Sequence, residues 1–144
     1  MRITVLNGPN LNLLGAREES HYGNFTLADL ETKMRAHLAN RADVSFYQSN
    51  HEGDIVTEIQ KLSSRDRLIL NAGAFTHTSI AIRDALAAVK VPFIEVHISN
   101  VYAREKFRHV SYLSAIAKGV VAGLGAESYL LAADFFLRSG VEAK

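Results

Sequence analysis

Residues 67–97 read RLILNAGAFTHTSIAIRDALAAVKVPFIEVH, and they hold two short apolar runs on either side of a segment with helical period. The runs at 67–73 and 93–99 are rich in Val, Ile, Leu and Phe and show little alternation with polar residues. That pattern is typical of parallel strands covered by helices on both faces. The segment between them, SIAIRDALAAV (79–89), has apolar residues at helical spacing. This stretch therefore predicts a strand–helix–strand unit.

The same alternation of apolar runs and helical segments extends along the whole chain. It predicts an α/β sandwich on a parallel sheet of about five strands. Thr26 is expected to cap a helix, with Asp29 in the capping-box position. Strands are expected within 2–7, 44–50, 67–73, 93–99 and 119–125, and helices within 26–39, 54–64, 79–89 and 128–139.

The composition is that of an ordinary globular protein, with 48% hydrophobic and 22% charged residues. The 144 residues suit a single domain spanning 1–144. A formal net charge of +1 gives no reason to expect a nucleic-acid partner. The lack of cysteine excludes disulfides and thiolate metal sites and fits a reducing compartment. Because no apolar run is long enough for a signal peptide or a membrane span, we expect a cytoplasmic protein without a membrane partner.

Two connections are much longer than the two to six residues usual between strands and helices. Residues 8–25 and residues 99–112 each follow the carboxyl end of an expected strand. In open parallel sheets, ligands bind beyond the carboxyl ends of the strands, where the strand order reverses. If the order is 2-1-3-4-5, both connections flank that place, and we expect the functional site there.

Polar side chains gather after three of the expected strands. Guanidinium groups bind oxyanions and amides bind hydroxyl and carbonyl groups, so a small polar anion is the expected ligand. The alternative is that these Asn and Thr residues only form turns and caps. The residues are Asn7, Asn10, Asn12, Arg17 and Tyr22 after the first strand, Asn71, Thr76, His77 and Thr78 after the third, and His97, Ser99, Asn100, Arg104 and Arg108 after the fourth.

Tyr22 is a candidate general base. A free tyrosine has a pKa of ~10, and nearby guanidinium groups such as Arg17 and Arg108 would favour its ionised form. The alternative is a ring that packs under the loop.

His97 is a candidate general acid, because strand alternation places Glu95, His97 and Ser99 on the same side. A carboxylate beside an imidazole fixes its tautomer and suits proton transfer near neutral pH. The alternative is a core histidine bonded to a backbone carbonyl. His77 is either a further site residue or simply a residue at a helix start. No HxH or HExxH spacing points to a metal.

The blocks LNGPNLNLLGARE (6–18), QSNHEGDIV (48–56), ILNAGAFTHTSIAIRDAL (69–86), PFIEVHISNVYAREKFRHVSY (92–112) and GVVAGLG (119–125) resemble the type II 3-dehydroquinate dehydratases. The resemblance runs from end to end. It implies a flavodoxin-like five-stranded parallel sheet of order 2-1-3-4-5 and assembly into a homododecamer, a tetramer of trimers.

The resemblance also implies an activity, the elimination of water from 3-dehydroquinate through an enolate in the shikimate route. Tyr22 would be the base, His97 the proton donor, and Arg17 on a lid would favour the tyrosinate and the charged transition state. No metal, Schiff-base lysine or cofactor is required. The substrate-binding residues carried over are Asn10, Asn71, His77, Ile98, Ser99 and Arg108, with Asp84 arriving from a neighbouring subunit.

Two positions depart from the family's usual pattern. Glu19 stands where a proline is common after the lid arginine, which bears on lid dynamics, and Ser128 stands where a glycine is common. The main alternative function is a flavodoxin-like module that binds a small anion or a flavin without catalysis. A receiver domain is disfavoured, because Asn7 and Asn71 occupy positions where it needs acidic residues. The sequence does not distinguish a biosynthetic role from quinate breakdown.

Overall fold

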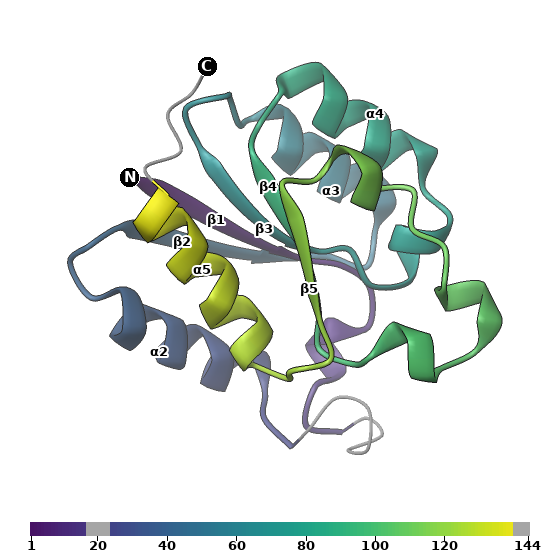
Figure 1. Cartoon of the computed structure of the whole chain (residues 1–144), viewed down its shortest axis with the longest axis horizontal. Helices are drawn as coiled ribbons and strands as arrows, with labels where there is room; N and C mark the ends of the chain where they lie inside the picture. Colours follow the sequence, from purple (N-terminus) through teal and green to yellow (C-terminus); the bar gives the residue numbers. More distant parts are fainter. Residues whose placement is uncertain (17–23, 140–144) are drawn as a thin grey trace.

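The computed structural model describes residues 1–16 and 24–139, which contain one five-stranded parallel sheet (Figure 1). The strand order is β2-β1-β3-β4-β5, which confirms the predicted order. The chain first extends the sheet from β1 to β2 and then continues on the other side of β1 with β3, so the order reverses between β1 and β3. The strands are β1 (Arg2–Asn7), β2 (Asp43–Gln48), β3 (Arg67–Asn71), β4 (Phe93–His97) and β5 (Gly119–Ala122).

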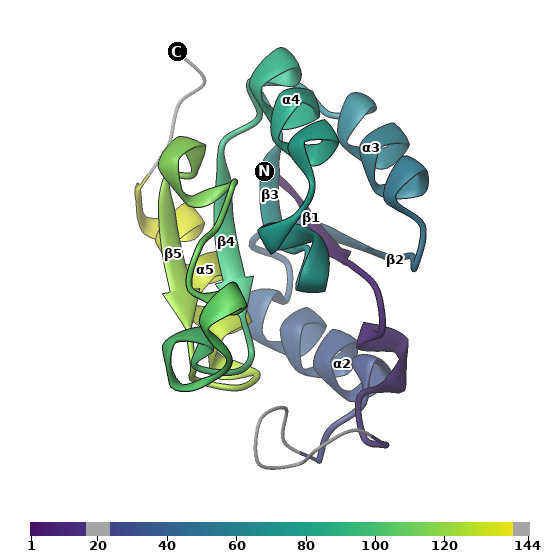
Figure 2. The same cartoon turned by 90° about the vertical axis from the view of Figure 1, so that its right-hand side faces the viewer.

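Helices cover both faces of this sheet (Figures 1 and 2). Helices α2 (Leu27–Leu38) and α5 (Glu127–Ser139) lie on one face, and α3 (Glu52–Gln60) and α4 (Ile80–Val89) lie on the other. The strands supply neighbouring side chains to opposite faces: Val5 packs in the core under α2 and α5, whereas Leu6 packs under α3 and α4. Both faces are therefore apolar, as the continuous apolar runs predicted.

The predicted cap of α2 is present. Thr26 Oγ1 accepts a hydrogen bond from the Asp29 amide at 3.1 Å, and an Asp29 carboxylate oxygen accepts one from the Thr26 amide at 2.9 Å. These reciprocal bonds satisfy two backbone donors that a helix start otherwise leaves without partners.

Helix α3 differs most from its expected range, since it begins at Glu52 and ends at Gln60 rather than spanning 54–64. Beyond it, the Asp66 carboxylate accepts hydrogen bonds from the amide and hydroxyl of Ser63. Such side-chain bonds to nearby backbone compete with helix formation, which explains the early end. Strand β5 stops at Ala122 because Gly123 and Gly125, with φ of 90° and 61°, turn the chain away from the sheet.

Short 3₁₀ turns replace an α-helix between β4 and β5 (the green segment in Figure 1). They are η3 (Val101–Ala103), η4 (Lys106–Arg108) and η5 (Ser114–Ile116). Similar turns follow the two strands between which the order reverses: η1 (Leu11–Leu13) follows β1, and η2 (Gly73–His77) follows β3. The carboxyl ends of β1, β3 and β4 are therefore followed directly by 3₁₀ turns rather than by α-helices.

The first turn after β1 lies close to the turn after β3. Gly8 donates its backbone N–H to the Asn71 carbonyl at 2.8 Å, and a Cβ at position 8 would overlap the Ala72 carbonyl group. Only glycine fits here.

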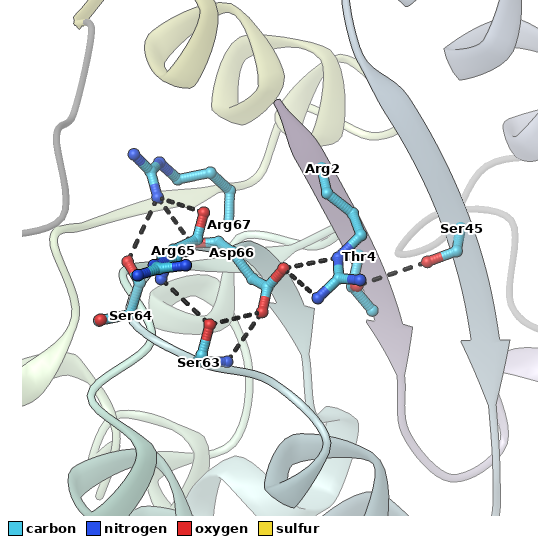
Figure 3. A network of polar contacts seen from close by, with 8 residues as sticks. All are labelled: Arg2, Thr4, Ser45, Ser63, Ser64, Arg65, Asp66 and Arg67. Carbon is cyan, nitrogen blue, oxygen red and sulfur yellow. Dashed lines mark hydrogen bonds and ion pairs between the residues drawn. The ribbon is translucent and has the colours of Figure 1, made fainter.

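The amino edge of the sheet carries a separate polar network (Figure 3). Asp66 is buried and accepts hydrogen bonds from Arg2 Nε at 2.6 Å and from the amide and hydroxyl of Ser63 at 2.8 and 3.1 Å. Arg67 caps the same turn through bonds to backbone carbonyls.

No helix in the described part of the chain is both long enough and apolar enough to cross a membrane.

Candidate active site

A cavity of about 100 Å³ opens at the carboxyl edge, where the strand order reverses between β1 and β3. Its walls come from the connections that follow β1, β3 and β4, as the sequence predicted. The lining residues are Pro9, Asn10, Leu11, Asn71, Gly73, Ala74, His77, His97, Ile98, Ser99, Val101, Arg104 and Arg108.

Seven of the ten predicted site residues line this cavity: Asn10, Asn71, His77, His97, Ile98, Ser99 and Arg108. Asp84 lies exposed on α4 and is not part of the lining. Arg17 and Tyr22 lie outside the described residues.

His97 forms a buried pair with Glu95 on the same strand. Its Nε2 lies 2.7 Å from Glu95 Oε2, and the two side chains are 7% and 3% exposed. Burial alone would raise the pKa of Glu95, but hydrogen bonds from His97, Ser111 and Ser114 outweigh it and lower that pKa. An ionised Glu95 can only accept, so Nε2 carries a hydrogen and Nδ1 is the nitrogen left to exchange a proton with a ligand.

His77 is held in the opposite tautomer. Its Nδ1 lies 2.8 Å from the Val110 carbonyl, which can only accept, so Nδ1 carries the hydrogen. Burial lowers the pKa of His77, and electrostatic interactions with His97 and Arg108 act in the same direction, against the opposing effects of the bond to Val110 and of Glu95. A neutral His77 therefore offers Nε2 as a hydrogen-bond acceptor.

Two guanidinium groups give the cavity its charge. Arg104 donates to the Ser99 hydroxyl at 3.2 Å, and Arg108 is paired with Glu105 at 2.6 Å. Positive charge prevails on the lining, because it includes these two arginines and no Asp or Glu among the described residues. The cavity therefore favours an anion that also carries hydroxyl groups.

Asn71 is oriented by a buried chain of hydrogen bonds. Its Nδ2 donates to the Tyr129 hydroxyl at 2.8 Å, which in turn donates to Asn7 Oδ1 at 2.6 Å. The Asn71 Oδ1 accepts from the Gly73 amide at 3.1 Å. Since Asn7 and Asn71 are register partners at the ends of β1 and β3, Tyr129 on α5 ties the two strands together at the cavity. The second hydrogen on Nδ2 is left for a ligand.

The turn after β1 is shaped by Asn10, which has a left-handed backbone with φ of 68°. Asparagine tolerates this conformation better than most residues. The backbone N–H of Asn10 donates to Asn50 Oδ1 at 3.0 Å, which fixes the turn against the segment after β2.

Among the described residues, no three His, Asp or Glu side chains are grouped so that they could hold a metal ion.

A sequence model of the family described as dehydroquinase class II matches residues 1–137. The chain belongs to the class II dehydroquinases. This class II dehydroquinase is 56% identical over 130 residues to the 3-dehydroquinate dehydratase of Azorhizobium caulinodans, covering 90% of this chain and 88% of the relative. The 3-dehydroquinate dehydratase of Actinobacillus pleuropneumoniae serotype 5b is 54% identical over 136 residues, covering 93% and 88%.

Solved structures agree with this assignment. The crystal structure of the type II dehydroquinase from Butyrivibrio crossotus has a TM-score of 0.90 with this chain at 45% identity, covering 94% of this chain and 96% of the other. That of Propionibacterium acnes has a TM-score of 0.90 at 41% identity, covering 94% and 95%. The predicted family and fold are thus both confirmed.

Sequence reasoning missed three residues of this class II dehydroquinase that support the site. Ser111 and Ser114 bind Glu95, and Tyr129 binds Asn71. Their separations of 16, 19 and 58 residues from these partners leave no periodic signal in the sequence.

Proposed function

We propose that this class II dehydroquinase is a 3-dehydroquinate dehydratase, a hydro-lyase of the shikimate pathway that converts 3-dehydroquinate to 3-dehydroshikimate. The observation that carries the proposal is the buried Glu95–His97 pair in a cavity lined by Arg104 and Arg108. It joins a proton donor to groups that attract an anionic substrate. The names of the relatives point to the same reaction.

The elimination needs a base, a stabilised enolate and an acid. Tyr22, as tyrosinate favoured by Arg17, takes a proton from the carbon next to the ketone. A water near Asn10 stabilises the enolate oxygen. His97, which takes up a proton on Nδ1 before the elimination, gives that proton to the departing hydroxyl and is left neutral with its hydrogen on Nε2, still bonded to Glu95. The group that moves the proton therefore stays fixed in orientation.

The substrate is held by its carboxylate and its hydroxyl groups. The carboxylate meets the free N–H of Asn71 and the backbone amides of Ile98 and Ser99. The ring hydroxyls meet His77 and Arg108, with Asp84 reaching in from a neighbouring subunit. The exposed position of Asp84 on α4 and its absence from the cavity lining are compatible with that role.

The assembly we propose is a homododecamer, a tetramer of trimers, of this single-domain chain in the cytoplasm. Multi-angle light scattering on the purified protein would then give a mass close to twelve copies. A monomer that is fully active would remove both the dodecamer and the shared role of Asp84.

The reaction is tested by adding 3-dehydroquinate to the purified protein in the presence of a chelator and following the absorbance of the conjugated product. A rise in ultraviolet absorbance that depends on the protein is expected. Binding without any product would leave the alternative, a small-anion binding module, and a purified protein that is yellow would favour a flavin carrier.

A further inference from the structure

Residues 110–114, here called the strap, lead from η4 into the first residue of η5 and bind His77 and Glu95, the partner of His97. The Val110 carbonyl accepts from His77 Nδ1 at 2.8 Å. The Tyr112 amide donates to the Thr76 carbonyl at 3.0 Å, next to His77 in the chain. Ser111 and Ser114 both reach Glu95, the partner of His97. One short segment therefore binds His77 directly and His97 through Glu95.

The hydroxyl of Ser111 has every hydrogen-bonding position occupied. It donates to Glu95 Oε1 at 2.7 Å and accepts from the amides of Leu113 and Ser114, each at 3.0 Å. A serine hydroxyl has one donor and two acceptor positions, so its hydrogen has no alternative partner. The side chain of Leu113 is buried in the core beside α3 and α4, which anchors the strap.

Glu95 is thereby bonded at both oxygens. Oε1 accepts from Ser111 and from Ser114, the latter at 2.9 Å, and Oε2 faces His97. A carboxylate this deeply buried would be costly without such bonds. The titratable groups around it are His97 on β4 and His77 on η2, whose ring is stacked on that of His97.

We propose that Ser111 and Ser114 are positioning residues for the proton donor. They hold Glu95 ionised and in one orientation, so that His97 keeps its hydrogen on Nε2 and presents Nδ1 to the leaving hydroxyl. The proposal rests on the proposed function for the role of His97. It adds that the strap, rather than β4 alone, decides which nitrogen of His97 acts.

The test compares the full-length Ser111→Ala/Ser114→Ala double variant with a matched control, Ser63→Ala. Ser63 has a similar pattern at the opposite edge of the sheet, donating to Asp66 Oδ2 and accepting from one backbone amide, that of Arg65 (Figure 3). Both variants lose serine–carboxylate bonds that stabilise a turn. Only the double variant touches the partner of His97.

We expect kcat of the double variant to fall about tenfold or more with KM little changed, since hydrogen bonds to a charged group are lost. Ser63→Ala should keep the wild-type kcat. The ¹⁵N NMR signals of His97 should show hydrogen on Nε2 in the wild type and a mixture of tautomers in the double variant. Carboxyl ¹³C titration, with Glu95 assigned by its absence in Glu95→Gln, should place the pKa of Glu95 higher in the double variant.

An unchanged tautomer and an unchanged Glu95 titration in a folded double variant would overturn the proposal. So would an equal loss of kcat in Ser63→Ala, because the strap would then act only through general stability. Inactivity of the wild type toward 3-dehydroquinate would instead refute the proposed function, and the two NMR measurements would still decide whether the strap fixes Glu95 and His97.

Discussion

The rings of His77 and His97 lie nearly parallel, with centroids 6.3 Å apart and planes 16° apart, yet they are held in opposite tautomers. The carbonyl of Val110 binds Nδ1 of one ring, and the carboxylate of Glu95 binds Nε2 of the other. Under the proposed mechanism these two chemically identical side chains would have different roles, His77 as an acceptor for a substrate hydroxyl and His97 as the donor to the departing hydroxyl.

Removing the proposed donor should stop the reaction without unfolding the protein. We expect His97→Ala to lower kcat by about 100-fold or more. The exposed His51→Ala variant is the control and should behave as wild type. The measurement is steady-state turnover of 3-dehydroquinate with circular dichroism to verify folding, and a His97→Ala enzyme with normal turnover would rule out this role.

Removing the proposed base should have an equally severe effect. Tyr22→Phe deletes only a hydroxyl, so turnover should be abolished while ligand binding survives. Tyr102→Phe, which changes a tyrosine that is 68% exposed, is the matched control. Wild-type rates in Tyr22→Phe would show that another group takes the proton.

Arg17 is expected to act on developing charge rather than on ground-state binding. Arg17→Ala should therefore lower kcat more than it weakens the affinity for a non-reacting substrate analogue. Kinetics together with calorimetric titration of that analogue separate the two effects. An unchanged kcat with weaker binding would reassign Arg17 as a substrate clamp.

The hydroxyl of Tyr129 links two strand ends, and its loss should cost stability. Tyr129→Phe leaves the buried amides of Asn7 and Asn71 without their shared partner, so the free energy of unfolding should fall by about 1–3 kcal/mol. Chemical denaturation measures this. A double-mutant cycle with Asn7→Ala should show strong coupling, whereas additive effects would mean that the bridge contributes little.

The free energy of unfolding should fall in acid because Asp66 becomes protonated. Burial alone would raise its pKa, but hydrogen bonds from Ser63 and Arg2 lower it below the ordinary value of ~3.9. A carboxyl group with a lowered pKa in the folded protein stabilises the fold when the pH is above the pKa of the unfolded chain. This stabilisation is lost as the pH falls through the lower pKa of the folded state.

Asp66→Asn should therefore be less stable than wild type at pH 7, by about 2 kcal/mol, and the difference should shrink as the solution becomes acidic. Denaturation between neutral pH and pH ~3 checks the sign. Its exposed counterpart Asp43→Asn serves as the control. A stability gap that widens in acid would contradict the assignment.

The sequence was most informative where local geometry decides the structure. Alternation along β4 placed Glu95 beside His97, and the 2.7 Å bond confirms it. The capping box at Thr26 was equally accessible, whereas the order of the strands, also confirmed, came from the family resemblance and not from local pattern. The bounds of helix α3 were predicted less well. Hydrogen bonds between Ser63 and Asp66 compete with the helix beyond Gln60, and the hydrophobic period of the sequence does not change there to mark the end.

Long-range contacts were beyond the sequence. Ser111 meets its partner only because the β4–β5 connection returns to β4, and Tyr129 only because α5 packs against one face of the sheet. The roles of Arg17, Tyr22 and Asp84 stay predictions, the first two because they lie outside the described residues and the third because a single subunit does not bring it to the cavity.

The contact of Gly8 with the Ala72 carbonyl has a genetic consequence. Every other amino acid carries a Cβ that would push the first and third strands apart just where Asn7 and Asn71 must stay side by side. Any missense change in codon 8 should thus abolish activity. Laboratory evolution that diversifies the entrance of the cavity should retain glycine at this position.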